Sequence, residues 1–268
     1  MADFDYWRKQ GAKPLFPEVD SMRPEQRRLA GKILVIGGNK GAFFAVAQVA
    51  RVAREIGVGE CRILLPDSLK NTIPTSGGVY FAEAETSGAF GQKSLAEMRR
   101  QAAWADAVVL VGDVGRNGET SVALAEFLTD LDKPVYLTRD AVDAVMSDAM
   151  NWALREQSTV MLLTMPQLQK LLRALYYPKV VTLSMPTNQL VELLHKFTLS
   201  YAMVVTTLHN EQLLVAEGGE VVSMPLGESY LTPISLFDGS LVLKFAALSL
   251  WNPSCRGLQA VARSWLMK

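Results

Sequence analysis

Asp238 is the residue of this sequence whose position best suits acid–base chemistry. It stands in the turn SLFDG, which opens the amphipathic helical stretch 235–248. A carboxylate at a helix N-terminus either caps the helix through backbone amides or serves as a general base or acid at the mouth of a sheet. The spacing alone favours the capping role, and the catalytic role is the alternative.

Two glycine-rich turns are able to bring backbone amides close to a ligand. GGNKGA (37–42) and VGDVGRNGE (111–119) each follow an apolar, strand-like run. Glycine permits close backbone approach, and the N-terminus of a following helix favours an anion. The first turn lacks the G-x-G-x-x-G spacing and the Lys-Ser/Thr pair of a P-loop, so a tight turn without a ligand is its alternative. For the second, the alternative is a loop with a surface salt bridge through Asp113 and Arg116.

The remaining polar residues fit structural roles. Thr164 in LLTMPQL is predicted to cap the following helix, which has a proline in its first turn. His195 is expected on a helix and His209 in a turn. Neither histidine has a partner at metal-ligand spacing, so no zinc or iron site is expected. Cys61 and Cys255 lie far apart in the sequence and are expected to be free thiols rather than a disulfide.

The elements that must position these residues alternate between strands and helices. Continuous apolar runs predict buried strands, and 3.6-residue periodicity predicts helices. The predicted strands are 32–37, 61–66, 78–85, 106–112, 134–138 and 158–164, and the predicted helices are 43–57, 94–105, 118–131 and 166–176. Three closely spaced strands (202–207, 212–217 and 220–225) and two closing helices (about 235–250 and 255–267) follow. This order predicts an α/β fold with a mostly parallel sheet, helices on both faces and an antiparallel edge.

The composition bounds the domain organisation and the partners. The chain has 268 residues, of which 49% are hydrophobic and 20% are charged, with Lys+Arg and Asp+Glu both 27. One domain over residues 31–268 is predicted, preceded by an arm (1–30) that prolines interrupt. A balanced charge argues against nucleic acid and an anionic membrane, and favours a small molecule or a protein as partner. The polar N-terminus and the short apolar stretch 241–251, which contains Lys244, predict a cytoplasmic protein.

The order of these turns over residues 30–250 resembles the ADP- or ATP-dependent NAD(P)H-hydrate dehydratases, the YjeF C-terminal domains of the ribokinase-like superfamily. The family pattern GGSxGYTGAA aligns without a gap with the run from Gly37 to Gly59, and Ala45 is kept. Phenylalanines at 43 and 44 stand in the family's Tyr-Thr-Gly segment and are expected to fill part of the pocket. The resemblance implies a three-layer ribokinase-like sandwich, with ADP or ATP as cofactor and hydrated NAD(P)H as substrate.

Further residues match the family pattern after the central strands. The pattern GPGLGR is similar to VGDVGR, where Gly112, Gly115 and Arg116 are kept, while a Pro-Gly pair is less well matched around Asp113. The pattern DADAL is similar to TRDAV, where Asp140 is kept. By this resemblance, the substrate-binding residues are Ala45, Gly112, Gly115 and Asp140.

The residues that carry the family chemistry match less well. The family's TPHPGE becomes TMPQL, so the substrate His aligns with Met165 and the Glu with Leu168. The nucleotide-binding KGxxT run aligns at Thr207 without its Lys or Gly, and GGTGD aligns with SLFDG. Ungapped alignment places Gly239 opposite the catalytic Asp, in a nucleotide-binding turn, and a shift of one residue brings in Asp238. Leu236 and Phe237 there replace glycines whose amides would hold a phosphate.

Three hypotheses follow. The chain is a diverged or degenerate member that binds a different ligand or another protein, or an active dehydratase that uses Asp238, or a small-molecule or sugar kinase. Phe43, Phe44 and Phe237 packed into the cleft would indicate a degenerate site, and an open cleft beside Asp238 would indicate an enzyme. The resemblance and the apolar composition also imply self-association into a homo-oligomer.

Overall fold

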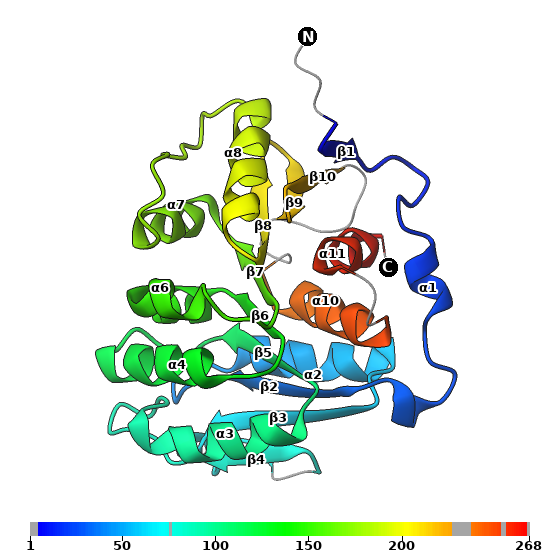
Figure 1. Cartoon of the computed structure of the whole chain (residues 1–268). Helices are drawn as coiled ribbons and strands as arrows, with labels where there is room; N and C mark the ends of the chain where they lie inside the picture. Colours follow the sequence, from blue (N-terminus) through cyan, green and yellow to red (C-terminus); the bar gives the residue numbers. More distant parts are fainter. Residues whose placement is uncertain (1–4, 75–76, 227–236, 253–255, 267–268) are drawn as a thin grey trace.

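A ten-stranded sheet forms the centre of the molecule, and helices cover both of its faces (Figure 1). The structure is a computed structural model that describes residues 5–74, 77–226, 237–252 and 256–266. The strand order is β1-β10-β9-β8-β7-β6-β5-β2-β3-β4. The strands are β1 (Trp7–Lys9), β2 (Lys32–Gly37), β3 (Glu60–Pro66), β4 (Val79–Ala82), β5 (Ala107–Gly112), β6 (Val135–Thr138), β7 (Thr159–Leu163), β8 (Met203–His209), β9 (Gln212–Glu217) and β10 (Glu220–Pro225).

The sheet is parallel from β4 through to β8 and turns antiparallel at β9 and β10. Strand β1 then adds to β10 in parallel. The central strand β5, with the sequence AVVLVG, is buried along its whole length, as a strand covered on both faces requires. The predicted parallel sheet with an antiparallel edge is confirmed.

Two helical layers cover the sheet. One layer (left in Figure 1) holds α3 (Leu95–Trp104), α4 (Gly118–Asp130), α5 (Asp140–Val145), α6 (Ala149–Trp152), α7 (Met165–Ala174) and α8 (Thr187–Ser200). The other layer holds α1 (Glu18–Ser21), α2 (Phe44–Ile56), α10 (Ser240–Trp251) and α11 (Gly257–Trp265). Short 3-10 turns are η1 (Arg27–Leu29), η2 (Asp67–Leu69), η3 (Gln92–Ser94) and η4 (Met146–Asp148).

Most predicted elements lie where the periodicity placed them. Helix α2 ends before Gly57, which adopts a left-handed conformation (φ 87°) that glycine tolerates best. Strand β4 stops at Ala82, so the predicted extent to 85 is too long. The helix predicted to begin near 235 begins at Ser240 in the described chain, and residues 227–236, 253–255 and 267–268 lie outside the described residues.

The N-terminal arm is packed against the rest of the chain where it is described. Strand β1 pairs with β10, Phe16 and Val19 are buried in the core beside α11, and Trp7 donates a hydrogen bond to Ser223 (2.9 Å). Within the described ranges, no helix is long and apolar enough to cross a membrane.

Candidate functional site

The polar residues singled out from the sequence meet at one edge of the sheet. Strands β2, β5 and β6 end there, and α2, α5 and α10 begin there. Ligands of open parallel sheets bind at this edge, where loops and helix N-termini meet. We call this place the mouth and define it by Ala45, Asp113, Arg139, Asp140 and Asp238.

Asp140 holds the loop that follows β5. Its Oδ1 accepts a hydrogen bond from the Asp113 amide (2.7 Å), and its Oδ2 accepts one from the Gly115 amide (3.1 Å). Both carboxylate oxygens are therefore engaged by backbone. The two glycines of this loop, Gly112 (φ 99°) and Gly115 (φ 88°), adopt conformations that other residues avoid. A Cβ on Gly112 would also stand 2.7 Å from Asp140 Oδ1.

Asp113 caps α2 from a neighbouring strand. The residue before α2, Phe43, makes no side-chain cap, and Asp113 Oδ2 accepts the hydrogen bond of the Ala45 amide instead (2.9 Å). Its Oδ1 accepts from Arg139 Nη2 at 2.5 Å, and only 6% of the Asp113 side chain is exposed. An internal carboxylate thus occupies the amide that a helix N-terminus offers to an anion.

Arg139 spans the mouth from β6 to the turn before α10. Besides Asp113, its guanidinium donates to the Phe237 carbonyl (3.2 Å). The Arg139 backbone lies at φ 58° and ψ −141°, a region that is otherwise nearly reserved for glycine and is held only by its surroundings. Gln167 holds it by donating to the Arg139 carbonyl (2.7 Å) and to Asp143 (2.8 Å). Two strained residues, Asp113 (φ 57°) and Arg139, therefore face each other in one ion pair.

Asp238 and Gly239 form the N-terminus of α10. The cap residue of α10 is Gly239, which makes no side-chain cap, so Asp238 lies one residue before the cap. Its Oδ1 accepts a hydrogen bond from the Ser240 amide (2.7 Å), a turn contact with the first residue of the helix. Gly239 is buried, and a Cβ there would lie 2.2 Å from Val111 and 2.8 Å from Val49. Close helix–sheet packing thus explains this glycine without a ligand. Burial lowers the pKa of Lys244, one turn further along α10, and the charge of Asp238 partly opposes this shift.

The phenylalanines divide between two environments. Phe43 and Phe237 are half-buried and pack against the core formed by α2, α10 and α11. Phe44 is 61% exposed, so the expectation that it fills the pocket is wrong. The reason is helical geometry, since Ala45 and Val49 take the buried face of α2 and leave Phe44 on the outer one.

Residues of β6, β7, β8 and the start of α7 are buried next to one another in the sheet and its core. Met165 and Leu168, at the positions of the family's His and Glu, are buried in the core, and Thr164 caps α7 in a capping box with Gln167. Thr138 and Thr206 were not predicted. Both pair with Leu162 in neighbouring strands, are fully buried, and have hydroxyls without a partner among the described residues. Such hydroxyls are rare in proteins.

Histidine and cysteine contribute nothing to the mouth in the described chain. His195 is half-buried on α8, where Tyr6 stacks on its ring at 3.7 Å. His209 ends β8 and its Nε2 lies 2.7 Å from the Met185 carbonyl. Cys61 is a free thiol in β3, and Cys255 lies outside the described residues. The described ranges hold no cluster of three metal-ligating side chains.

The chain has the ribokinase-like fold. A ribokinase-like superfamily protein from Enterococcus faecalis superposes with a TM-score of 0.68 at 12% identity, over 98% of this chain and 86% of that one. An ADP/ATP-dependent NAD(P)H-hydrate dehydratase from Bacillus subtilis, co-crystallised with ATP and Mg²⁺, gives 0.65 at 14% identity, over 95% and 87%. Pyridoxal kinase from Bacillus subtilis, an ADP complex, gives 0.52 at 12% identity, over 87% and 88%.

These neighbours include a dehydratase and a kinase, and identities this low establish a common fold alone. No protein-family model and no curated protein sequence matches the chain. Chemically, the mouth offers one carboxylate that its own helix engages through a single oxygen, Asp238, and one arginine that an aspartate neutralises.

Proposed function

We propose that this chain is a ribokinase-like protein that no longer performs nucleotide-driven dehydration or phosphoryl transfer, and that it binds a different small molecule or another protein. The Asp113 carboxylate carries the proposal, because it occupies the Ala45 amide and the Arg139 guanidinium at the same time. These are the two groups at the mouth best able to hold an anion.

A phosphate would have to displace this carboxylate in order to bind the Ala45 amide at the start of α2. Displacement would leave a charged, 6% exposed Asp113 beside a polyanion, and like charges at short range repel strongly where water is scarce. The N-terminus of α10 offers no easier place, since Asp238 already accepts its Ser240 amide. Both helix N-termini therefore carry the protein's own negative charge.

The link from Arg139 to the Phe237 carbonyl supports the same proposal. It ties the end of β6 to the turn before α10, across the position where a ligand of this fold would lie.

An active dehydratase that uses Asp238 is the second candidate. One observation favours it: among the described residues, Asp238 makes a single hydrogen bond and keeps its other oxygen for a proton. The structural neighbour that was co-crystallised with ATP and Mg²⁺ adds support for nucleotide binding.

Thermal denaturation with added ligands separates the candidates. Saturation at a hundred times Kd stabilises a native protein by about 2.7 kcal/mol, which raises the Tm by several degrees. We expect no shift with ADP, ATP–Mg²⁺, NADPH or hydrated NADPH, and no regeneration of NADPH from its hydrate. A nucleotide-induced shift together with turnover that Asp238→Ala abolishes would establish the dehydratase instead.

A matched variant controls for stability. Asp106 accepts the Lys32 amide (2.8 Å) at the opposite edge of the sheet, so Asp106→Ala removes a similar hydrogen bond far from the mouth. If Asp106→Ala and Asp238→Ala lower the Tm alike and neither changes any ligand response, Asp238 is a structural cap. ATP with a hydroxylated acceptor, assayed for ADP release, tests the kinase hypothesis in the same samples.

A further inference from the structure

Exposed apolar side chains gather on one helical layer. Ten large hydrophobic residues are exposed among the described residues, and six of them belong to α4, to α6 or to the segments that follow α6 and α7: Val122, Met150, Leu154, Tyr176, Val180 and Leu183. Figure 1 shows α7, α6 and α4 in this order along the same face of the sheet. Exposed apolar residues that gather on one layer mark an interaction site more often than scattered residues do.

Tyr176 is the most exposed of these residues. It directly follows the last turn of α7, where a left-handed residue ends the helix and glycine is preferred. Tyr176 adopts that conformation (φ 52°) with 85% of its surface exposed. Tyr176 does not belong to the hydrophobic core clusters of the described chain. An aromatic side chain at this position therefore adds no core packing to the stability of the monomer.

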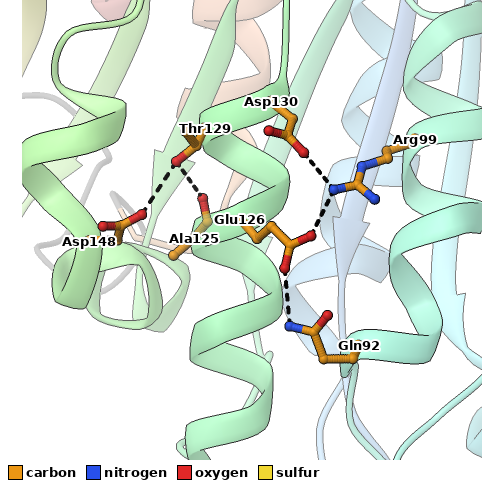
Figure 2. Close-up of polar contacts among 7 residues, drawn as sticks. All are labelled: Gln92, Arg99, Ala125, Glu126, Thr129, Asp130 and Asp148. Carbon is orange, nitrogen blue, oxygen red and sulfur yellow. Dashed lines mark hydrogen bonds and ion pairs between the residues drawn. The ribbon is translucent and has the colours of Figure 1, made fainter.

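An acidic cleft of about 400 Å³ lies beside α6 on the same layer. Its walls come from α4 and from the segment before α6, and Val122 and Ala125 form its apolar part. Figure 2 shows the carboxylates around it: Glu126 and Asp130 share Arg99, and Asp148 lies beside Thr129. Among the described residues, Asp148 accepts hydrogen bonds from Thr129 and Asn151 and forms no ion pair. One arginine thus balances three carboxylates.

The other side of α6 carries the opposite charge. Helix α7 contains Lys170 and Arg173 and no acidic residue, and Lys179 follows it. Lys170 pairs with Asp143, whereas Arg173 and Lys179 are exposed and form no ion pair among the described residues. The surface is therefore acidic on the α4 side, apolar at α6 and basic on the α7 side.

We infer that two copies of this chain associate through the α4–α6–α7 surface, related by a two-fold axis that runs along α6 in the plane of contact. Such an axis places α7 of each copy against α4 of the other. Helices α4 and α7 both return from parallel strands, so their C-terminal ends lie at the same edge of the sheet. Arg173 and Tyr176 of one copy then meet the cleft beside Asp148 of the other, and Tyr and Arg are the residues that most often anchor interfaces.

Sedimentation velocity on the full chain tests this contact. We expect a concentration-dependent dimer whose dissociation constant rises at least tenfold in Tyr176→Gly, while the unfolding temperature of that variant, measured at a concentration where both proteins are monomeric, does not fall. The control is Leu29→Ala, an exposed apolar residue (64%) on the N-terminal arm, which should leave association unchanged. A wild type that stays monomeric at its highest soluble concentration would overturn the inference, and so would equal association of Tyr176→Gly.

Charge exchange tests the pairing between copies. Asp148→Lys and Arg173→Glu should each weaken the dimer, and the double variant should regain most of the lost affinity, because the exchanged charges meet again across the two-fold axis. No regain in a double variant that folds normally would refute this arrangement. The test does not depend on any ligand at the mouth, so it can fail while the proposed function holds, or the reverse.

Discussion

The substitution Asp113→Asn tests whether the ion pair with Arg139 holds the mouth together. Removing one partner of a fully buried pair costs about 3–5 kcal/mol, but the Arg139 side chain is 32% exposed and water would solvate part of its charge. That lowers the expected loss to about 1–2 kcal/mol. The weaker, neutral acceptor left for the Ala45 amide adds about 0.5–1 kcal/mol. Asparagine tolerates the positive φ of this position, so backbone strain adds little.

The expected total is a loss of about 1.5–3 kcal/mol in the free energy of unfolding. Urea unfolding measures it as a lower midpoint at an unchanged m-value. Combined with Arg139→Gln in a double-mutant cycle, the pair should show a coupling of about 1–2 kcal/mol.

An exposed pair provides the control. Arg51 and Glu55 lie four residues apart on α2 with both side chains 56% exposed, so Glu55→Gln should change stability by less than about 0.5 kcal/mol. If Asp113→Asn is as mild as Glu55→Gln, or if the cycle shows no coupling, the reasoning about the mouth is refuted.

Three more predictions have defined outcomes. Gly239→Ala should destabilise the fold by more than about 2 kcal/mol, because its Cβ would overlap Val111 at positive φ. The control is Gly118→Ala, which should be neutral because a Cβ at Gly118 meets no atom within 4 Å. Equal melting temperatures of the Gly239→Ala and Gly118→Ala variants would contradict the packing explanation for Gly239. Thr164→Ala should lower the free energy of unfolding by about 1 kcal/mol, measured by urea unfolding, because the cap of α7 is lost. An unchanged free energy of unfolding would show that this cap does not stabilise the protein. Burial raises the pKa of the Cys61 thiol to about 12, so the folded state holds this proton more tightly. The free energy of unfolding should therefore fall with pH above about 8.5 by up to about 1.4 kcal/mol per unit, and Cys61→Ala should remove that part of the slope.

The sheet and its helices could be predicted because each element carries its own signal. Six buried residues in a row identify β5, and Gly57 marks the end of α2. Strand β1 has no such signal, since its three residues are stabilised by pairing with β10, far along the chain. Local periodicity cannot report a partner that distant.

From the residues alone, the mouth was predicted only where the role of a residue is local, while the family resemblance indicated Ala45 and Asp140. Asp238 could be identified because a carboxylate before a helix has a local meaning, and it bonds the Ser240 amide, although Gly239 is the cap residue itself. Arg139 was missed because its role depends on Asp113, which lies 26 residues away in another loop. Its one sequence signal is an arginine where the family pattern DADAL has a small alanine. The positive φ that the two residues share leaves no trace in their side-chain types.

The pairing of β1 with β10 has a consequence for the time course of folding. Trp7 of β1 pairs with Val221 of β10, so β1 has no partner strand until more than 200 further residues have been synthesised. At the usual pace of translation, that interval lasts roughly 10–40 s. During that interval, the unpaired β1 must not pair with strands of other nascent chains. Its exposed Arg8 and Lys9 suit that wait, because positive charges on an unpaired strand discourage aggregation.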